Sequence, residues 1–362
     1  MSSEHKKIKV AIDLSTTGKG GGPYVSSSRI MQSALKDKYD FEVLHYDTTI
    51  GSGISVKRIL DLKKQLINLS PDLVHFTGLQ LSGFHVAVAC RLAGIQHTVL
   101  TIRGTSADAL YFNSLKRFLM KYVLEPITLL LTKRFYGVST YVTQRTIARV
   151  FKRKCAGAIY NFPPEPLDAA IRSQIRTELG LADTDILIVS VARITRDKGY
   201  DVLDKAILQF KNDNNVKFVI VGDGDYLPQF KEVLASQISS GQVFCLGYRG
   251  DVQQILRGCD IFVLPTLHET LSVALLEASR EGLALVASDT GGVPEIVETG
   301  YNGELVPVGD AAGLYRAMSK LSKDKELRTA YGAHAALKVE EKFSASSIVD
   351  QIDAVYQEVL QS

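Results

Sequence analysis

Residues 161–168 read NFPPEPLD, with prolines at 163, 164 and 166. Proline has no backbone N–H to donate and interrupts helices, so this stretch breaks any regular element. A pattern of short apolar runs separated by helical segments stands before it and starts again after it. We therefore interpret the stretch as a linker between two domains, the first over residues 1–165 and the second over residues 166–343.

Short apolar runs rich in β-branched residues recur on both sides of the linker. Six precede it and five follow it: IKVAIDL (8–14), FEVLHY (41–46), DLVHF (72–76), HTVLTI (97–102), FYGVS (135–139), AGAIY (156–160), DILIVSVAR (185–193), VKFVIVGDG (216–224), QVFCLG (242–247), IFVLPT (261–266) and LALVASD (283–289). Helical segments such as YVSSSRIMQSALKDK (24–38) and VKRILDLKKQLINL (56–69) separate them. This alternation predicts two doubly wound, Rossmann-like α/β domains in tandem, facing a cleft at the carboxyl ends of their sheets.

The last segment, residues 344–362, carries apolar residues at helical spacing after a serine-rich start. Such a stripe needs a surface to cover. We expect this helix to return across the domain junction.

The composition indicates a globular chain that remains in a reducing compartment. Of its 362 residues 46% are apolar, enough for two cores, and its four cysteines form no CxxC pair. The amino terminus lacks the features of a signal peptide, and no apolar stretch approaches the ~18 residues of a membrane span. We expect a cytoplasmic location.

Charge is distributed unevenly between the two halves. Residues 1–165 hold 23 Lys and Arg against 11 Asp and Glu, a net charge of +12, whereas residues 166–362 have a net charge of −9. A basic amino-terminal half can orient a protein on an anionic surface. The alternative explanation is an uneven distribution of solvated charge between the two domains.

Several common catalytic signatures are absent from the sequence. No GxxxxGK[ST], HExxH or GxSxG occurs, which argues against a P-loop nucleotidase, a zinc protease of that type and a serine hydrolase. The scattered histidines His75, His85 and His97 are better read as structural residues than as metal ligands.

Glycine-rich turns follow two predicted strands. GKGGGP (18–23), with Gly20, Gly21 and Gly22, stands where backbone approaches a phosphate or sugar, and a flexible turn is the alternative. GDGD (222–225), beginning with Gly222, is a weaker signal of the same kind.

Two stretches of the second half point to a diphosphate. In SVARITRDKG (190–199), Arg193 and Lys198 both follow the end of a predicted strand. The planar guanidinium of arginine and the mobile ammonium of lysine together suit a diphosphate. In HETLSVALLE (268–277), a turn leads into a helix, so Leu271 and Ser272 offer backbone amides at its amino terminus. Ser272 is also a candidate cap.

Taken in order, VARITRDKG, GDGD, LGYRGD, the glutamates at 269 and 277, and GGVPEIVETGYNGELVPVGD resemble the retaining glycosyltransferases of family four, glycosyl transferases group 1, which have the GT-B fold. The resemblance covers nearly the whole chain. It implies an enzyme of capsule, O-antigen or glycolipid type that moves a sugar from a nucleotide-sugar donor, with UDP favoured over GDP, to a glycan or lipid-linked acceptor. No metal and no protein nucleophile are implied.

The resemblance also implies roles for individual residues. Arg193 and Lys198 would bind the diphosphate, Glu269 hydroxyls of the donor sugar, and Glu277 the ribose. The amides of Leu271 and Ser272 would complete the phosphate site, the backbone of Arg249 would lie beside the base, and glycines 20–22 would admit the donor.

Two departures from the family pattern concern specificity. Thr270 and Leu271 follow the first glutamate where many members have a small residue and an aromatic, which predicts a different sugar pocket. Arg103 ends the fourth strand where many members have histidine; it is a candidate for acceptor or phosphate binding, and a structural ion pair is the alternative.

An acceptor linked to lipid would lie against the basic first domain. Residues 116–134, KRFLMKYVLEPITLLLTKR, mix cations with apolar residues, which fits either peripheral contact with an anionic membrane or an ordinary amphipathic helix on the sheet.

The sequence leaves the donor sugar, the acceptor and the oligomeric state open. Two other function classes are compatible with the fold: a nucleotide-sugar epimerase or glycan phosphorylase, and a non-catalytic nucleotide-sugar-binding partner.

Overall fold

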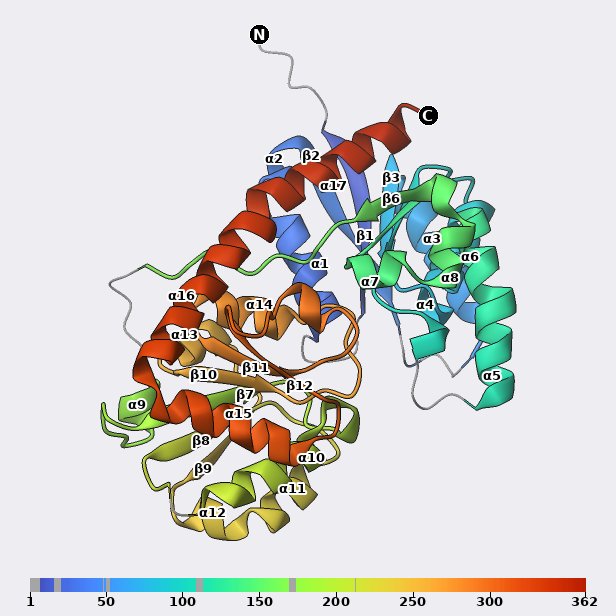
Figure 1. Cartoon of the computed structure of the whole chain (residues 1–362). Helices are drawn as coiled ribbons and strands as arrows, with labels where there is room; N and C mark the ends of the chain where they lie inside the picture. The colour runs from blue at the N-terminus through green and yellow to red at the C-terminus, as the bar shows by residue number, and fades with distance from the viewer. Residues whose placement is uncertain are drawn as a thin grey trace. The chain divides into compact units, whose positions relative to one another are not determined.

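The computed structural model describes residues 7–15, 21–47, 49, 53–108, 113–168, 174–211 and 213–362. By its contacts the chain divides into two compact units (Figure 1): unit 1 is Met1–Phe162 with Ala345–Ser362, and unit 2 is Pro163–Ser344. The division falls inside the proline-rich stretch. The returning segment 345–362 is counted in unit 1.

Unit 1 is built on a six-stranded parallel sheet in the order β2-β1-β3-β4-β5-β6. Its strands are β1 (Ile8–Ser15), β2 (Tyr39–Tyr46), β3 (Leu73–Thr77), β4 (Thr98–Ile102), β5 (Arg134–Gly137) and β6 (Cys155–Ala158). Its helices are α1 (Gly22–Gln32), α2 (Leu35–Lys38), α3 (Val56–Leu69), α4 (Leu81–Leu92), η1 (Ser106–Asp108), α5 (Ser114–Leu119), η2 (Met120–Leu124), α6 (Glu125–Leu131), α7 (Thr140–Thr143), α8 (Thr146–Val150), η3 (Lys152–Lys154) and α17 (Ala345–Leu360).

Unit 2 repeats the architecture with the order β12-β11-β10-β7-β8-β9, again parallel. Its strands are β7 (Ile186–Val191), β8 (Val216–Val221), β9 (Val243–Gly247), β10 (Ile261–Leu264), β11 (Ala284–Ser288) and β12 (Gly303–Val306). Its helices are α9 (Ile175–Glu178), η4 (Arg196–Lys198), α10 (Tyr200–Ile207), η5 (Leu208–Phe210), α11 (Leu227–Val233), α12 (Ala235–Ser239), α13 (Val252–Arg257), α14 (Val273–Arg280), η6 (Val293–Glu295), α15 (Ala311–Lys323) and α16 (Lys325–Lys342). The predicted pair of Rossmann-like α/β domains is confirmed.

Local sequence explains where typical elements form. In α3 the side chain of Ser55 accepts a hydrogen bond from the Arg58 amide at 3.3 Å, and Ile59, Leu62 and Leu66 recur at helical spacing and are buried. The core of unit 2 is rich in aromatic rings in edge contact, such as Phe210 and Phe218 with ring centroids 5.2 Å apart.

The helix predicted over residues 116–134 differs in detail. The segment consists of α5, the π-helical turn η2 and α6, and Arg134 already belongs to β5. Pro126 stands in the first turn of α6, where its missing N–H removes a helical hydrogen bond and the wider turn precedes it.

Helix α17 is joined to the sheet of unit 1 by buried polar contacts. The Tyr356 hydroxyl lies 2.6 Å from His75 Nδ1, and His75 Nε2 lies 2.7 Å from Thr101 Oγ1. Burial lowers the pKa of His75 to about 3, so the ring is neutral, and Tyr39 donates to Asp353 at 2.6 Å. Figure 1 shows α17 in red beside the blue strands of this sheet. His75 is thus a structural residue, as predicted.

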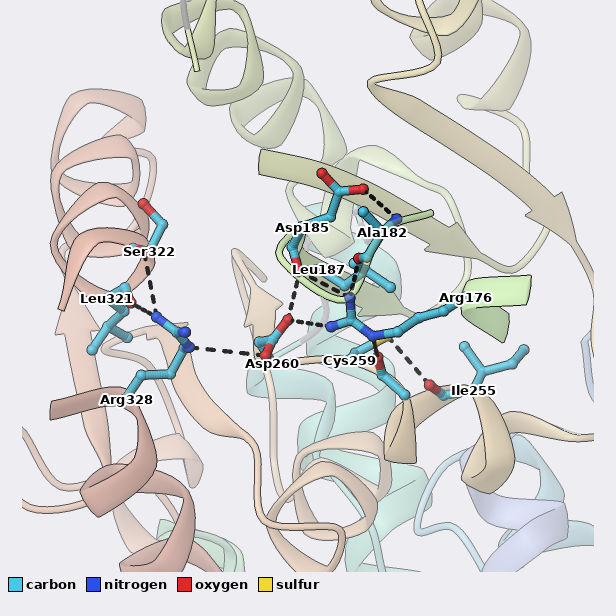
Figure 2. A network of polar contacts seen from close by, with 11 residues as sticks. Arg176, Ala182, Asp185, Leu187, Ile255, Cys259, Asp260, Leu321, Ser322 and Arg328 are labelled. Atoms are coloured by element: carbon cyan, nitrogen blue, oxygen red, sulfur yellow. Dashed lines mark hydrogen bonds and ion pairs between the residues drawn. The ribbon is translucent and has the colours of Figure 1, made fainter. Parts of the chain in front are cut away.

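Asp260, which directly precedes β10, anchors the amino-terminal ends of strands in unit 2 (Figure 2). Its Oδ2 accepts from the Leu187 amide at 2.8 Å and from Arg176 Nη2 at 2.9 Å, and Arg328 Nε lies 3.9 Å from Oδ1. Arg176 also donates to main-chain carbonyls, those of Gly258, Ala182 and Asp185. This network joins α9 and α16 to the sheet at the edge opposite the strands' carboxyl ends.

Candidate active site

The carboxyl ends of β7 and β10 form the topological switch point of unit 2. From β7 the chain continues to β8 and β9 on one side, and β10 then pairs with the other side of β7. Open α/β sheets bind ligands at this point, where the loops after the two strands diverge. Lys198 follows β7 and Glu269 follows β10, so two of the predicted site residues stand there.

Lys198 and Glu269 form an ion pair. Lys198 Nζ lies 2.8 Å from Glu269 Oε2, and the two side chains are 19% and 14% exposed. Glu269 Oε1 accepts a second hydrogen bond, from the Thr270 amide at 3.1 Å. Because both oxygens are held, the carboxylate has one orientation and presents fixed negative charge beside a cation.

Two glycines allow the loops that carry this pair to pack closely. Gly199 has φ +75°, and a Cβ there would lie 1.8 Å from the carbonyl oxygen of Pro265. Gly291 has φ +58°, and a Cβ there would lie 1.7 Å from the carbonyl oxygen of Glu269. Neither glycine was assigned a role from sequence. The available signals were a glycine directly after Lys198 and the GG pair at 291–292.

Helix α14 begins at Val273, so Glu269 lies in the loop before it and Glu277 lies within it. The Ser272 side chain accepts from the Leu275 amide at 3.2 Å, which confirms the predicted cap. Neither the Leu271 nor the Ser272 amide donates a hydrogen bond within the described part of the chain. The amino end of α14 thus has donors and a positive dipole end available for an anion.

The side chain of Arg193 pairs with Asp197 and not with Glu269. Its side chain is 68% exposed and its Nη2 lies 3.4 Å from Asp197 Oδ2. A cation this exposed makes a weak surface ion pair, so it can move to an anionic ligand at little cost. The structure therefore brings Lys198 to Glu269 and leaves Arg193 at the rim of the same loop.

The GDGD turn after β8 packs against the loop that carries Arg193. Gly222 has φ +138°, and a Cβ there would lie 1.9 Å from the carbonyl oxygen of Ala192. A Cβ on Gly224 would lie 2.3 Å from the carbonyl oxygen of Ile194. These glycines have a steric role in placing the backbone on both sides of Arg193.

The guanidinium of Arg249, after β9, is held by two carboxylates. Nε and Nη2 donate to Asp251 at 2.8 and 2.7 Å, and Nη1 and Nη2 donate to Glu178 at 2.6 and 3.1 Å. These bonds, first to Asp251 and then to Glu178, raise the pKa of Arg249. The side chain is therefore occupied within the protein, and only its backbone is a candidate for ligand contact.

The described site residues predicted in unit 1 lie at the start of α1 and directly after β4. Gly20 falls outside the described residues, whereas Gly21 precedes α1 and Gly22 begins it. Arg103 follows β4, and its Nη1 donates to Asn161 Oδ1 at 3.0 Å. Asn161 Oδ1 also accepts from Ser26 Oγ at 2.6 Å.

No cluster of three or more His, Cys, Asp or Glu side chains that could hold a metal occurs among the residues with described positions. In that same part of the chain, no helix has the length and apolarity needed to cross a membrane. The four cysteines are free thiols.

Residues 171–338 match the family model of glycosyl transferases group 1. The matched stretch covers most of unit 2. Two curated relatives align over most of the length of this chain. N-acetyl-alpha-D-glucosaminyl L-malate synthase of Bacillus anthracis is 25% identical over 88% of this chain and 81% of its own. The UDP-Gal:alpha-D-GlcNAc-diphosphoundecaprenol alpha-1,3-galactosyltransferase of Escherichia coli is 27% identical over 83% of this chain and 79% of its own.

Solved structures have the same fold as this chain. Anabaena HepE, determined in complex with UDP and glucose, superimposes with a TM-score of 0.79 at 19% identity, covering 97% of this chain and 100% of that one. At this identity the likeness concerns the fold. Family and fold both agree with the resemblance stated from the sequence motifs.

Proposed function

We propose that the protein transfers a sugar from a nucleotide-sugar donor, with UDP favoured, to a glycan or lipid-linked acceptor. The observation that carries the proposal is the Lys198–Glu269 pair at the switch point of unit 2, beside the amino end of α14. Cations and amide donors suit a diphosphate, and a fixed carboxylate suits sugar hydroxyls. The E. coli relative is named as using UDP-Gal.

Within this proposal unit 2 binds the donor. Lys198 and Arg193 bind the diphosphate together with the amides of Leu271 and Ser272, because each supplies positive charge or an N–H donor. The partly buried Glu277 receives the ribose hydroxyls. The loops at Gly222 and Arg249 lie against the nucleoside through their backbones, and Thr270 faces the sugar.

The proposed chemistry needs stabilisation of charge more than proton transfer by the protein. Cleavage of the anomeric bond places negative charge on the diphosphate, so Lys198, Arg193 and the α14 amides strengthen their interactions in the transition state. We propose that the configuration is retained, with the departing phosphate taking the proton of the attacking hydroxyl. In this scheme no metal is required, since the cations of unit 2 perform that role.

Donor binding is the first test. UDP- and GDP-sugars are titrated into the purified protein by calorimetry, and slow hydrolysis is followed by chromatography of the released nucleotide. We expect one UDP-sugar to bind and to be hydrolysed, with both properties reduced in Lys198→Ala and unchanged in Glu232→Ala, an exposed glutamate on α11. Absence of binding by the whole panel would refute the proposal.

We also propose that unit 1 makes peripheral contact with the anionic inner face of the cytoplasmic membrane. There the protein would reach a lipid-linked acceptor. Five apolar side chains on α5 and η2 are 40–69% exposed: Leu115, Phe118, Leu119, Tyr122 and Val123. Lys116, Arg117 and Lys121 accompany them, and residues 113–124 contain no acid. Exposed apolar groups with cations favour an anionic interface.

Vesicle sedimentation tests this contact. Binding to phosphatidylglycerol vesicles at low salt should fall in Lys116→Glu/Lys121→Glu and persist in Lys57→Glu/Lys64→Glu, a matched pair of exposed lysines on α3. Equal sedimentation of both double variants would contradict the assignment of this face.

A further inference from the structure

Asp13 and Thr77 stand at the switch point of unit 1. The chain passes from β1 to β2 on one side of the sheet and then to β3, which pairs with the other side of β1. Asp13 lies near the end of β1 and Thr77 ends β3, with Thr77 Oγ1 donating to Asp13 Oδ2 across 3.4 Å. This edge is the position where an open α/β sheet binds a ligand.

The carboxyl of Asp13 is buried with one oxygen unused. The side chain is 6% exposed, and Oδ1 has no hydrogen-bond partner among the described residues. A buried polar atom without a partner costs free energy, and such atoms are rare in folded proteins. In its ionised form this carboxyl can only accept hydrogen bonds, so the partner that Oδ1 lacks in that form is a donor.

The carboxyl of Asp13 interacts with the positive charge of Arg103. The charge of Arg103 favours the ionised form of Asp13, whereas burial has the larger and opposite effect and raises the pKa of Asp13 to about 7. Arg103 is itself oriented by Asn161, which also receives a hydrogen bond from Ser26. Among the described residues, a Cβ built on Gly21, which precedes α1, would meet only Pro23 Cδ, at 3.9 Å.

We propose that Oδ1 of Asp13 accepts a hydrogen bond from a hydroxyl group of the sugar acceptor, which makes Asp13 an acceptor-positioning residue. The inference rests on the proposed transferase function and adds a ligand group in unit 1. Thr77 keeps the other oxygen of the carboxyl, and Arg103 balances its charge. A sugar hydroxyl supplies the single donor that the site lacks.

The test separates acceptor from donor. Wild type, Asp13→Asn and Asp13→Ala are assayed with the UDP-sugar that binds best, with methyl glycosides and α-D-GlcNAc-diphosphoundecaprenol as acceptor probes. We expect Asp13→Ala to raise the acceptor KM at least tenfold, and Asp13→Asn to raise it less because its amide oxygen still accepts. Donor affinity and hydrolysis without acceptor should stay within twofold of wild type.

Asp40→Asn, an exposed carboxylate on the neighbouring strand β2, is the matched control and should behave as wild type. An unchanged acceptor KM in both Asp13 variants would overturn the inference, and so would an equal loss of donor affinity and acceptor use, which indicates a structural role. Wild type that hydrolyses the donor but transfers to no probe would also overturn it. Wild type that binds no donor would instead refute the proposed function.

Discussion

Replacing Asp13 with asparagine should stabilise unit 1 at neutral pH. Burial raises the pKa of this carboxyl from 3.8 to about 7, with the charge of Arg103 offsetting part of the effect. Because one pKa unit corresponds to about 1.4 kcal/mol, the ionised carboxyl destabilises the folded state by about 4 kcal/mol. The amide of asparagine has the same shape and carries no charge, so it avoids this penalty.

The sign of the effect depends on pH. The folded carboxyl holds its proton more tightly than the unfolded one, so its contribution to stability is fully present below about pH 4 and is lost as the pH rises to about 7. The unfolding free energy of Asp13→Asn minus that of wild type should therefore grow between pH 4 and pH 7 and then stay constant. Burial lowers the pKa of His75 to about 3 and raises those of Tyr46 and Cys90, the latter to about 12, so these neighbours keep their protonation over this range.

Urea denaturation with hydrogen–deuterium exchange of peptides from β1 measures this difference. Asp40→Asn on β2 serves as the control, because its side chain is exposed. A stability difference that is the same at pH 5 and pH 8 would refute the reasoning, as would an Asp13→Asn protein less stable than wild type at pH 8.

Four further predictions concern unit 2. Glu277→Ala should raise the nucleotide Kd at least about tenfold, since hydrogen bonds to a charged group contribute roughly 1.5–3 kcal/mol; equal affinity in calorimetry would contradict the ribose assignment. Glu269→Gln should lower kcat, measured by steady-state kinetics, far more than nucleotide affinity, measured by calorimetry. A larger loss of affinity than of kcat would contradict this. Gly199→Ala should lower the unfolding free energy by about 2 kcal/mol and weaken donor binding, because its Cβ meets the Pro265 carbonyl at a φ of +75°; an unchanged urea midpoint would argue against this packing. Asp260→Ala should lower the unfolding free energy by about 3 kcal/mol yet leave the donor Kd unchanged, and a selective loss of donor affinity would be the contrary result.

The sequence predicted those parts of the fold that depend on local signals. Runs of β-branched residues marked eleven strands, and the serine at 272 marked the start of α14. The strand β12 was missed because GELV is short and contains a glutamate, so its burial against β11 has no local signature. The predicted helix over 24–38 is divided at Ser33, whose hydroxyl bonds back to Ile30.

Within the site, types of residue were predictable and their partners were not. The charges of Lys198 and Glu269 were visible, but their ion pair joins positions 71 residues apart and depends on the sheet order. The clamp on Arg249 by Glu178 has the same separation. Asp13 was overlooked because it lies inside an apolar strand, where a single acid looks like a tolerated exception, and only its burial and unused oxygen distinguish it.

The attachment of α17 to unit 1 has a consequence for synthesis on the ribosome. Unit 2 is one continuous segment, so all of its strands have emerged before α17 is made. Unit 1 lacks the Tyr356 hydroxyl that meets His75, a partner 281 residues earlier, until translation has passed the whole of unit 2. Domains usually complete folding in the order of their synthesis, whereas here the first to be made is the last to be finished.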